Sequence, residues 1–309
     1  MTIKNYLSKT ITLLAATIFS ISSFAQNNEP MFEEIIVTAE KRSESLQDLS
    51  QAVTVLSGID LDNRQISTFV DLSAIAPGVN VAKNEGFKTV ITIRGVGYET
   101  NQNAIATPSV SYHLDGIYVA SPYSLQTDFL DLERIEVLRG PQGTLFGQNS
   151  TGGAINVVTQ APTTDETYGS ADITVGNHGL LKTRAFINKP ISENLAMRAS
   201  FISNKRDGFT ENLTNGQDLD DADSVSARIR LSYEPSDTFR ANFMAQMFHE
   251  DRNGAAQKGI IDPTPDPRQL RQNSLTEHQL DAELFSAVLE WDRENFSIKS
   301  LTSYQVDDI

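Results

Sequence analysis

The stretch that decides the fold runs from Glu133 to Gln160 and reads ERIEVLRGPQGTLFGQNSTGGAINVVTQ. Two apolar runs, Ile135–Leu138 and Ala154–Thr159, flank a segment that holds five glycines and one proline. Short apolar runs of this kind predict buried strands, and the glycines between them predict tight turns whose backbone passes close to a neighbour. Such turns can cradle a ligand or simply connect two strands, so the function of the stretch depends on the rest of the chain.

The composition limits the possible functions. The chain has 309 residues, enough for two domains, and a formal net charge of −15 from 25 basic and 40 acidic side chains. This negative charge argues against a nucleic-acid partner, because phosphate binding needs a basic face. The absence of cysteine excludes disulfide bonds, thiolate catalysis and thiolate metal sites.

The N-terminus has the three parts of a secretory signal peptide. Lys4 and Lys9 precede an apolar run, Ile11–Ile21, and Ser23-Phe24-Ala25 offers small residues at both positions that a signal peptidase reads. We therefore expect residues 1–25 to be a signal peptide and the protein to be exported. No later apolar run is long enough for a spanning helix, so a membrane form of this protein would have to be a β-barrel.

Residues 26–45 are polar apart from one β-branched island, Glu34–Ala39. An isolated run of this kind has no local partner and is suited to adding itself to an exposed sheet edge of another protein. The alternative is that the island forms the first strand of the following domain. The residue pattern leaves both interpretations open.

Residues 46–160 predict a compact α+β domain. Helical periodicity over Ile59–Ile75 falls in two pieces, with Thr68 as a possible cap of the second. Asp115-Gly116 between alternating runs is a strong hairpin signal. Strands are expected at Ala52–Leu56, Val79–Val81, Val90–Arg94, Val110–Leu114 and Ile117–Val119.

Residues 161–309 show a different pattern, with segments in which apolar and polar residues alternate. The segments are Tyr168–Val175, Leu180–Asn188, Leu195–Ser203, Ser224–Tyr233, Thr238–Phe248, Leu284–Trp291 and Phe296–Tyr304. Short turns alternate with two long polar loops, 207–223 and 250–279, as in outer-membrane barrels. A soluble antiparallel sheet would alternate too, but the signal peptide favours the barrel. Seven strands would leave two open edges, whereas a membrane barrel must close. We therefore expect the chain to be C-terminally incomplete.

No motif supports an enzyme, a cofactor or a metal site. Gly147 and Gly152 have the spacing of a phosphate-binding loop, but Gly153-Ala154 follow in place of Lys-Ser/Thr. The histidines at positions 113, 178, 249 and 278 are scattered rather than paired at metal-ligand spacing. Arg94 and Arg139 each end a predicted strand before a glycine, where an arginine can pair with a carboxylate or simply face solvent.

The order of these features resembles the TonB-dependent outer-membrane receptors. A signal peptide, EEIIVTAEKR, IRGVG, DGIYV, the Glu133–Gln160 stretch and alternating strands follow one another as in that family. The resemblance implies an α+β plug domain followed by antiparallel transmembrane β-barrel strands, the plug sitting inside a barrel of about 22 strands. It divides the chain into a signal peptide (1–25), a TonB-box segment (26–45), a plug (46–160) and the first barrel strands (161–309).

The resemblance also assigns roles to residues. Glu34, Ile35, Ile36, Val37, Thr38 and Ala39 would form the TonB box, which pairs with the C-terminal domain of TonB. Arg94 and Arg139 would latch the plug to glutamates of the barrel wall. The structural turns of the plug would be formed by Gly95, Asp115, Gly116, Gly140, Pro141, Gly143, Gly147, Gly152 and Gly153. Outward loops around Tyr98–Pro108 and Pro122–Thr127 would form the substrate floor.

The expected function is energised uptake of a scarce solute across the outer membrane of a Gram-negative cell. A ferric siderophore is the expected solute, and a carbohydrate or another organic solute is the alternative. A further alternative is a truncated plug protein that binds without transport. The expected partners are TonB, outer-membrane lipid and a small molecule or metal chelate, with no nucleic acid and no resident cofactor, and the protein is expected to be monomeric.

Overall fold

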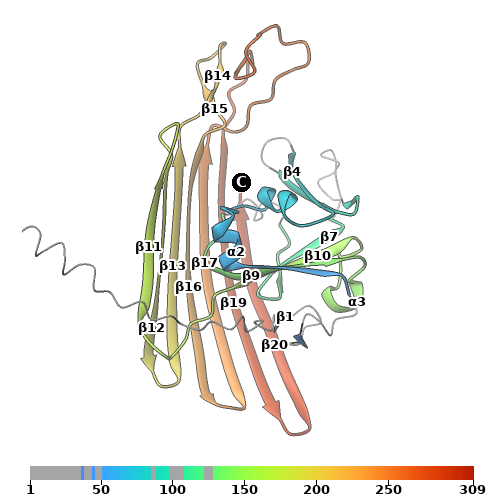
Figure 1. The fold of residues 1–309 in the computed structure, drawn as a ribbon, viewed down its shortest axis with the longest axis vertical. Helices are drawn as coiled ribbons and strands as arrows, with labels where there is room; N and C mark the ends of the chain where they lie inside the picture. Colours follow the sequence, from blue (N-terminus) through green and yellow to red (C-terminus); the bar gives the residue numbers. More distant parts are fainter. Residues whose placement is uncertain (1–35, 38–43, 46–50, 85–87, 98–107, 122–127) are drawn as a thin grey trace, which may run out of the picture. The chain divides into compact units, whose positions relative to one another are not determined.

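The seven alternating segments form one antiparallel sheet, here called the wall (Figure 1). The computed structural model describes residues 36–37, 44–45, 51–84, 88–97, 108–121 and 128–309, and those from Ile36 onward form one unit. The wall strands, paired in chain order, are β11 (Tyr168–Val175), β12 (Leu181–Ser192), β13 (Leu195–Arg206), β16 (Ala222–Ser236), β17 (Phe239–Arg252), β19 (His278–Arg293) and β20 (Phe296–Asp308). All seven predicted strands are confirmed.

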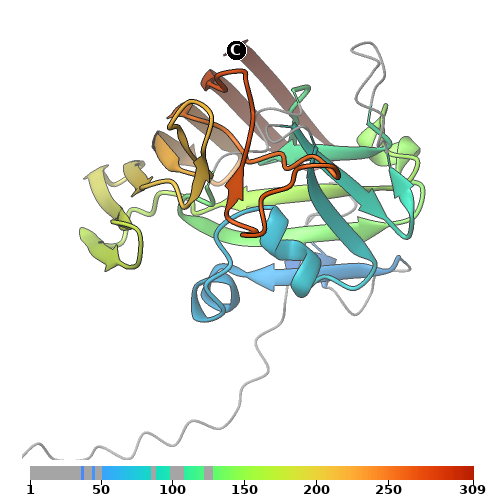
Figure 2. The same ribbon diagram turned by 90° about the horizontal axis from the view of Figure 1, so that it is seen from above.

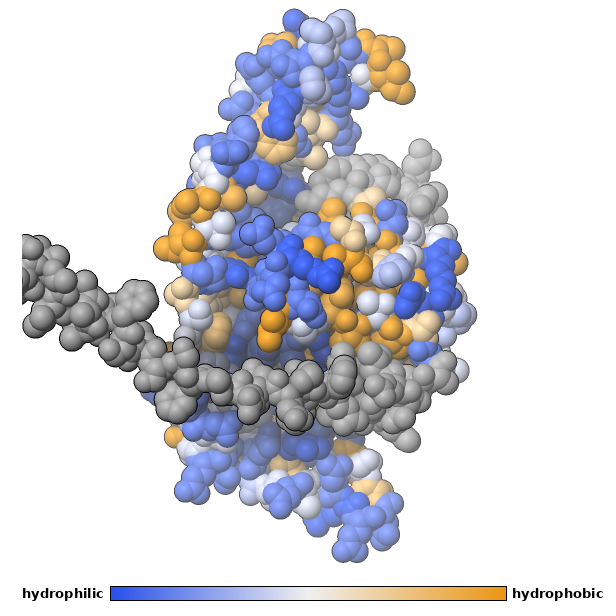
Figure 3. Space-filling model, viewed as in Figure 1, coloured by the Kyte–Doolittle hydropathy of each residue, from blue (hydrophilic) through white to orange (hydrophobic). Residues whose placement is uncertain are grey.

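The alternation gives the wall two chemically different faces. Side chains on its outer face are large, apolar and exposed, as at Ile229, Phe243 and Met247. The neighbouring positions on the inner face carry polar and charged groups that face the plug, such as Arg228 and Gln246. On the face seen in Figure 3, hydrophilic residues gather at the lower end of the wall and over most of the loops at its upper end.

The plug is built on a five-stranded mixed sheet in the order β3-β9-β10-β7-β8. The central strand, β10, pairs with β7 in parallel, and the other three neighbouring pairs are antiparallel. Seen from above, the wall curves around one side of the plug (Figure 2). The strands are β3 (Val53–Ser57), β9 (Leu132–Arg139), β10 (Gly153–Thr159), β7 (Val110–Leu114) and β8 (Ile117–Tyr118).

Smaller elements complete the plug. A second sheet contains β4 (Val79–Asn84), β5 (Lys88–Ile93) and β6 (Val96–Gly97), and the short helices are α2 (Gly58–Asn63), η1 (Val70–Ala74) and α3 (Gly143–Phe146). The two helical pieces before Ala76 are confirmed. The prediction that Thr68 caps the second piece is wrong, because the N-cap of η1 is Phe69. Instead, the Asp71 carboxylate accepts the N–H groups of Ser67 and Thr68 at 3.0 and 2.9 Å. No helix in the described ranges is long and apolar enough to cross a membrane.

The plug core centres on an aromatic cluster. Phe69 lies edge-on to Tyr112 and Phe129, with ring centroids 5.0 and 4.9 Å apart, and all three side chains are buried. Met244 and Leu284 of the wall belong to the same apolar cluster. Plug and wall therefore share part of one hydrophobic core.

The two long loops at the upper end of the wall are ordered against each other, which the sequence did not predict. They form a small sheet of β15 (Asp218–Leu219), β14 (Thr210–Asn212) and β18 (Gln269–Leu270), in which β14 and β18 are parallel. The Asn212 side chain donates to the carbonyl of Gln272 at 2.9 Å and accepts its N–H at 3.1 Å. Composition rich in Gly, Asp and Asn predicted irregular loops because it carries no information on pairing between two distant segments.

We predict that Gly153→Ala destabilises the plug by about 1–3 kcal/mol, because the added methyl group would overpack a buried site. Its φ is +150°, and a Cβ there would lie 2.3 Å from the carbonyl oxygen of Leu138 and 2.8 Å from a methyl carbon of Ile93. Gly143→Ala is the control, since a Cβ there meets nothing within 4 Å. The urea concentration at which protease cleaves the plug measures the effect. Equal midpoints for both variants would contradict the prediction.

Candidate functional site

The segment predicted to bind TonB is described only at its centre. Ile36–Val37 forms β1, which pairs with β2 (Glu44–Ser45) in a two-stranded antiparallel ladder. The expectation that the run has no local partner is therefore wrong at these two positions. Glu34, Ile35, Thr38 and Ala39 lie outside the described residues, as do the predicted signal peptide (1–25), Tyr98–Thr107 and Pro122–Thr127.

The structure brings the two predicted latch arginines to the same turn of the plug. Arg139 reaches the carbonyl of Pro77 at 3.5 Å and the hydroxyl of Thr54 at 2.9 Å, and the N–H of Arg94 donates to the carbonyl of Gly78 at 2.7 Å. Within the described part of the chain, neither arginine forms an ion pair. The partners expected from the wall are thus not among the residues described.

Two turns that contain predicted turn residues have the same geometry, and Arg94, predicted to end a strand, lies in one of them. Asp115-Gly116 joins β7 to β8 with φ values of +50° and +80°, and Arg94-Gly95 joins β5 to β6 with φ values of +54° and +77°. Positive φ at both central residues is the signature of the tight hairpin turn that matches strand twist. Arg94 is thus held in a conformation that is uncommon for a long side chain.

The remaining predicted turn residues surround a short helix that the sequence did not predict. Pro141 precedes α3, Gly143 begins it and Gly147 ends it with φ +75°. The N–H of Gly140 donates to the carbonyl of Gly152 at 3.1 Å, which closes the loop before Gly153 enters β10. In the described residues these groups serve backbone geometry, which agrees with turns rather than a ligand cradle.

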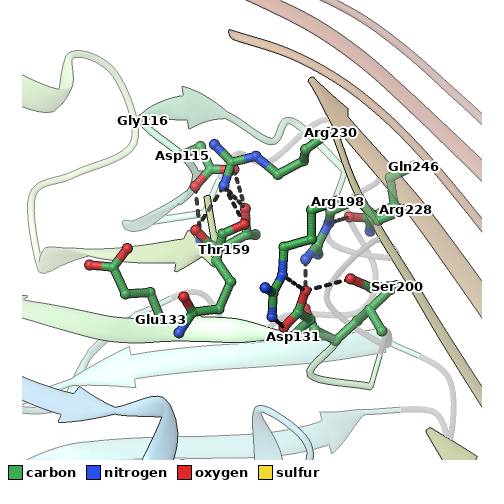
Figure 4. A network of polar contacts seen from close by, with 12 residues as sticks. Asp115, Gly116, Asp131, Glu133, Thr159, Arg198, Ser200, Arg228, Arg230 and Gln246 are labelled. Atoms are coloured by element: carbon green, nitrogen blue, oxygen red, sulfur yellow. Dashed lines mark hydrogen bonds and ion pairs between the residues drawn. The ribbon is translucent and has the colours of Figure 1, made fainter. Parts of the chain in front are cut away.

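A two-pronged ion pair between Asp131 of the plug and Arg198 of the wall was not predicted from the sequence (Figure 4). The guanidinium donates from Nε and Nη2 to the two carboxylate oxygens, both at 2.6 Å. The Ser200 hydroxyl donates to the same carboxylate, and the side chains of Asp131 and Arg198 are only 10% and 4% exposed. We call this contact the clamp. A buried two-pronged pair of this kind fixes both position and orientation.

A second contact joins the plug to β16. Arg230 donates to the carbonyl and hydroxyl oxygens of Thr159 at 2.7 and 2.5 Å, and its guanidinium lies 3.9 Å from the carboxylate of Asp115. That carboxylate accepts the N–H and hydroxyl of Thr159 at 2.9 and 2.8 Å. The hairpin turn, the end of β10 and the wall are therefore held in one network.

The segment Asp128–Asp131 runs along the inner face between β13 and β16. The buried Arg228 donates to the carbonyl of Leu130 at 2.6 Å and to Gln246 at 2.8 Å. The carboxylate of Asp128 lies 3.7 Å from the ammonium of Lys182. We call this line of contacts, from Asp128–Asp131 and Thr159 of the plug to Lys182, Arg198, Arg228 and Arg230 of the wall, the seam. Along the seam the plug supplies carboxylates and carbonyls and the wall supplies cations.

One signal in the sequence could have pointed to the seam. Arg228 and Arg230 stand on the polar side of an alternating strand, and Arg198 lies opposite Arg230 in the register of β13 and β16. Large cations in the middle of barrel strands are expensive unless they face the interior and find partners. The sequence could not show which residues are the partners, because Asp131 lies 67 positions from Arg198 and Thr159 lies 71 positions from Arg230.

The buried Tyr112 side chain lies on the plug side of the seam, near Arg228. Burial raises the pKa of the Tyr112 hydroxyl above its ordinary value, so that side chain stays neutral. Among the residues described, no three His, Cys, Asp or Glu side chains are grouped so that they could hold a metal ion. The site is a mechanical interface between two parts of one chain.

We predict that Asp131→Asn weakens the docking of the plug by about 3 kcal/mol, because it leaves the buried Arg198 without its carboxylate. Asparagine tolerates the φ of +50° at this position, so the change removes charge without straining the backbone. Asp223→Asn is the control, since its pair with Lys205 is 51% and 66% exposed. The urea midpoint for protease access to the plug is the measurement. A shift no larger than that of Asp223→Asn would rule the prediction out.

Comparison with known proteins identifies the two parts. Residues 45–154 match the family model described as the TonB-dependent receptor plug domain. The chain is 28% identical to the pesticin receptor of Yersinia pestis over 298 residues, which cover 88% of this chain and 43% of that protein. It is 31% identical to the iron-regulated outer membrane virulence protein of Vibrio cholerae over 159 residues, 48% of this chain and 23% of the relative. The chain thus spans less than half the length of these relatives.

Solved structures share the fold. The ferric yersiniabactin uptake receptor from Yersinia pestis superposes with a TM-score of 0.75 at 22% identity over 83% of this chain and 41% of its own. The siderophore receptor from Acinetobacter baumannii superposes with a TM-score of 0.69 at 16% identity, over 88% of this chain and 38% of its own. Members of this family lie in the Gram-negative outer membrane and are receptors rather than enzymes, as the absence of catalytic motifs led us to expect. The chain thus contains a TonB-dependent receptor plug domain at residues 45–154, followed by long antiparallel strands whose fold matches part of these solved receptors.

Proposed function

We propose that this chain is part of an outer-membrane receptor that imports a scarce solute with energy delivered through TonB, and that the solute is a ferric siderophore. The observation that carries the proposal is the docking of a plug against the polar inner face of a strand wall whose outer face is apolar. A plugged wall blocks passive diffusion, so passage requires work on the plug. The signal peptide proposed at residues 1–25 would direct export.

The choice of solute rests on relatives. The names of the similar proteins refer to pesticin, to iron regulation and to ferric yersiniabactin. A ferric chelate suits a protein of this kind, because a large, scarce solute cannot be taken up efficiently through a passive pore. A carbohydrate or another organic solute remains the alternative, to be separated by growth under iron limitation.

We further propose that Glu34–Ala39 is the TonB box and that residues 46–160 and 161–309 are plug and wall. The ladder between Ile36–Val37 and Glu44–Ser45 supports this role, because it holds the centre of the segment extended. An extended segment can exchange a short local partner for a strand of TonB without refolding. Arg94 and Arg139 are proposed to pair with wall carboxylates outside the described residues.

Deletion of Glu34–Ala39 should abolish energised uptake of ferric siderophore and leave binding of the solute at the cell surface unchanged, because the plug and wall contacts lie elsewhere. Uptake and binding of radiolabelled iron chelate by cells with and without TonB measure the two quantities. Uptake that persists after the deletion refutes the proposal. Binding without TonB-dependent uptake in the undeleted receptor supports the binding-only alternative instead.

Replacement of Ile36 by proline should weaken pairing with TonB, because proline lacks the N–H that a strand ladder needs and fixes φ. Site-specific crosslinking between the segment and the purified C-terminal domain of TonB gives the readout. Ile36→Val, which keeps a β-branched side chain and the N–H, is the matched control. Equal crosslinking yields for the two variants count against strand pairing.

A further inference from the structure

A cavity of about 470 Å³ lies between the plug and the first wall strands. On the plug side it is lined by α2 and by the segment that contains Phe129 and Asp131. On the wall side it is lined by β11, β12 and β13, including Tyr168 and Phe186. This volume falls within the range of about 300–1,000 Å³ that small organic ligands occupy. Two ion pairs of very different character border it.

The clamp borders the cavity on one side. Besides its bonds to Asp131, the Arg198 guanidinium donates to the Tyr168 hydroxyl at 3.0 Å and lies 4.1 Å from the ring centre of Phe186. Each charged group of the clamp is thus nearly removed from water and surrounded by partners. Separating it would leave a buried charge without compensation, which is strongly unfavourable.

On the other side, Arg184 connects α2 to the wall. Its Nη1 donates to the Asp62 carboxylate at 2.6 Å, while its Nε donates to both oxygens of Asp172 at 3.2 Å. The side chains of Arg184, Asp62 and Asp172 are 39%, 61% and 46% exposed. We call the contact between Arg184 and Asp62 the bridge. Ion pairs this exposed add little stability, and after separation Arg184 would keep its partner on the wall.

The part of the plug behind the bridge is lightly held. Helix α2 has six residues. Leu61 is buried, whereas Ile59 is 74% exposed. The helix follows β3, which lies at the edge of the plug sheet and, among the described strands, pairs with β9 alone. A short helix on an edge strand can move with fewer lost contacts than the segment around Asp131, which is joined to the central part of the sheet.

We propose that the cavity is a compartment on the solute's path between plug and wall, that the bridge of Arg184 and Asp62 is its gate, and that the clamp stays closed as the fixed anchor while α2 moves. This inference rests on the proposed function and adds to it a route and a gate. The charged groups of the lining already have ion-pair partners, Glu133 with Arg134 outside the lining and the others with one another, and the aromatic rings and hydroxyl groups remain. The cavity therefore suits an organic solute with an aromatic ring and hydrogen-bonding groups rather than a bare ion.

This chain has no cysteine, so each introduced cysteine is unique within its 309 residues, and the receptor without an introduced cysteine gives the background labelling. Ser67→Cys reports on the cavity, which Ser67 lines. Ser200→Cys reports on the clamp, where Ser200 is 5% exposed. The rate of labelling by N-ethylmaleimide is measured for the full receptor in cells with and without TonB. We expect active TonB to speed the labelling of Ser67→Cys and to leave Ser200→Cys protected.

A second comparison tests the gate without TonB. Asp62→Asn should raise the labelling rate of Ser67→Cys about two- to fivefold, as expected for loss of an exposed ion pair. Asp223→Asn, which removes an exposed ion pair away from the cavity, should leave the rate unchanged. An equal effect of the two substitutions, or none for Asp62→Asn, would overturn the gate.

The anchor and the proposed function fail in distinguishable ways. Labelling of Ser200→Cys that rises with TonB as much as that of Ser67→Cys would overturn the anchor, because the whole plug would then leave the wall. If TonB alters neither reporter although uptake depends on TonB, the route is wrong and the proposed function stands. If uptake itself is independent of TonB, the proposed function fails, and the comparison of Asp62→Asn with Asp223→Asn still decides the gate.

Discussion

A guanidinium group buried on the inner face of the wall must find a partner, and the partners come from the plug. Arg198 and Arg228 are 3% and 5% exposed, and they bond to Asp131 and to the carbonyl of Leu130. An unpaired charge in such a place would cost several kcal/mol. The wall strands of this chain therefore depend on the plug as much as the plug depends on the wall.

Successive side chains of a strand point to opposite faces, and this two-residue alternation produces both surfaces of the wall. On β16, Arg228 and Arg230 face inward while Ile229 between them faces outward and is 50% exposed. A slip by one residue would bring arginines to the apolar face and isoleucine to the polar seam. The polar seam thus helps to specify the register of the strands, in addition to holding the plug. This coupling links the fold of the wall to the site.

Features that depend on neighbours in sequence could be predicted, and features that depend on distant segments could not. The wall strands and the turn at Asp115-Gly116 follow from local alternation and from turn chemistry. The seam does not, because Asp131 and Arg198 are 67 positions apart and are brought together only where the plug packs against the wall. The pairing of β14 with β18 was missed for the same reason. The ladder between Ile36–Val37 and Glu44–Ser45 is local, and it was missed because the polar pair Glu44–Ser45 shows no strand pattern. Helix α3 was missed because one turn of helix leaves no periodic pattern.

The charges at two separate places on the plug have opposite sign. At the seam the plug offers Asp128 and Asp131 to cations of the wall. At the turn of Pro77 and Gly78 it offers Arg94 and Arg139, which have no ion-pair partner among the described residues. With the proposed wall carboxylates paired to Arg94 and Arg139, rotating the plug would set like charges against each other, which costs several kcal/mol. Opposite charge on the two surfaces therefore favours a single orientation of the plug, and a single orientation is what allows one exposed bridge to open while one buried clamp holds.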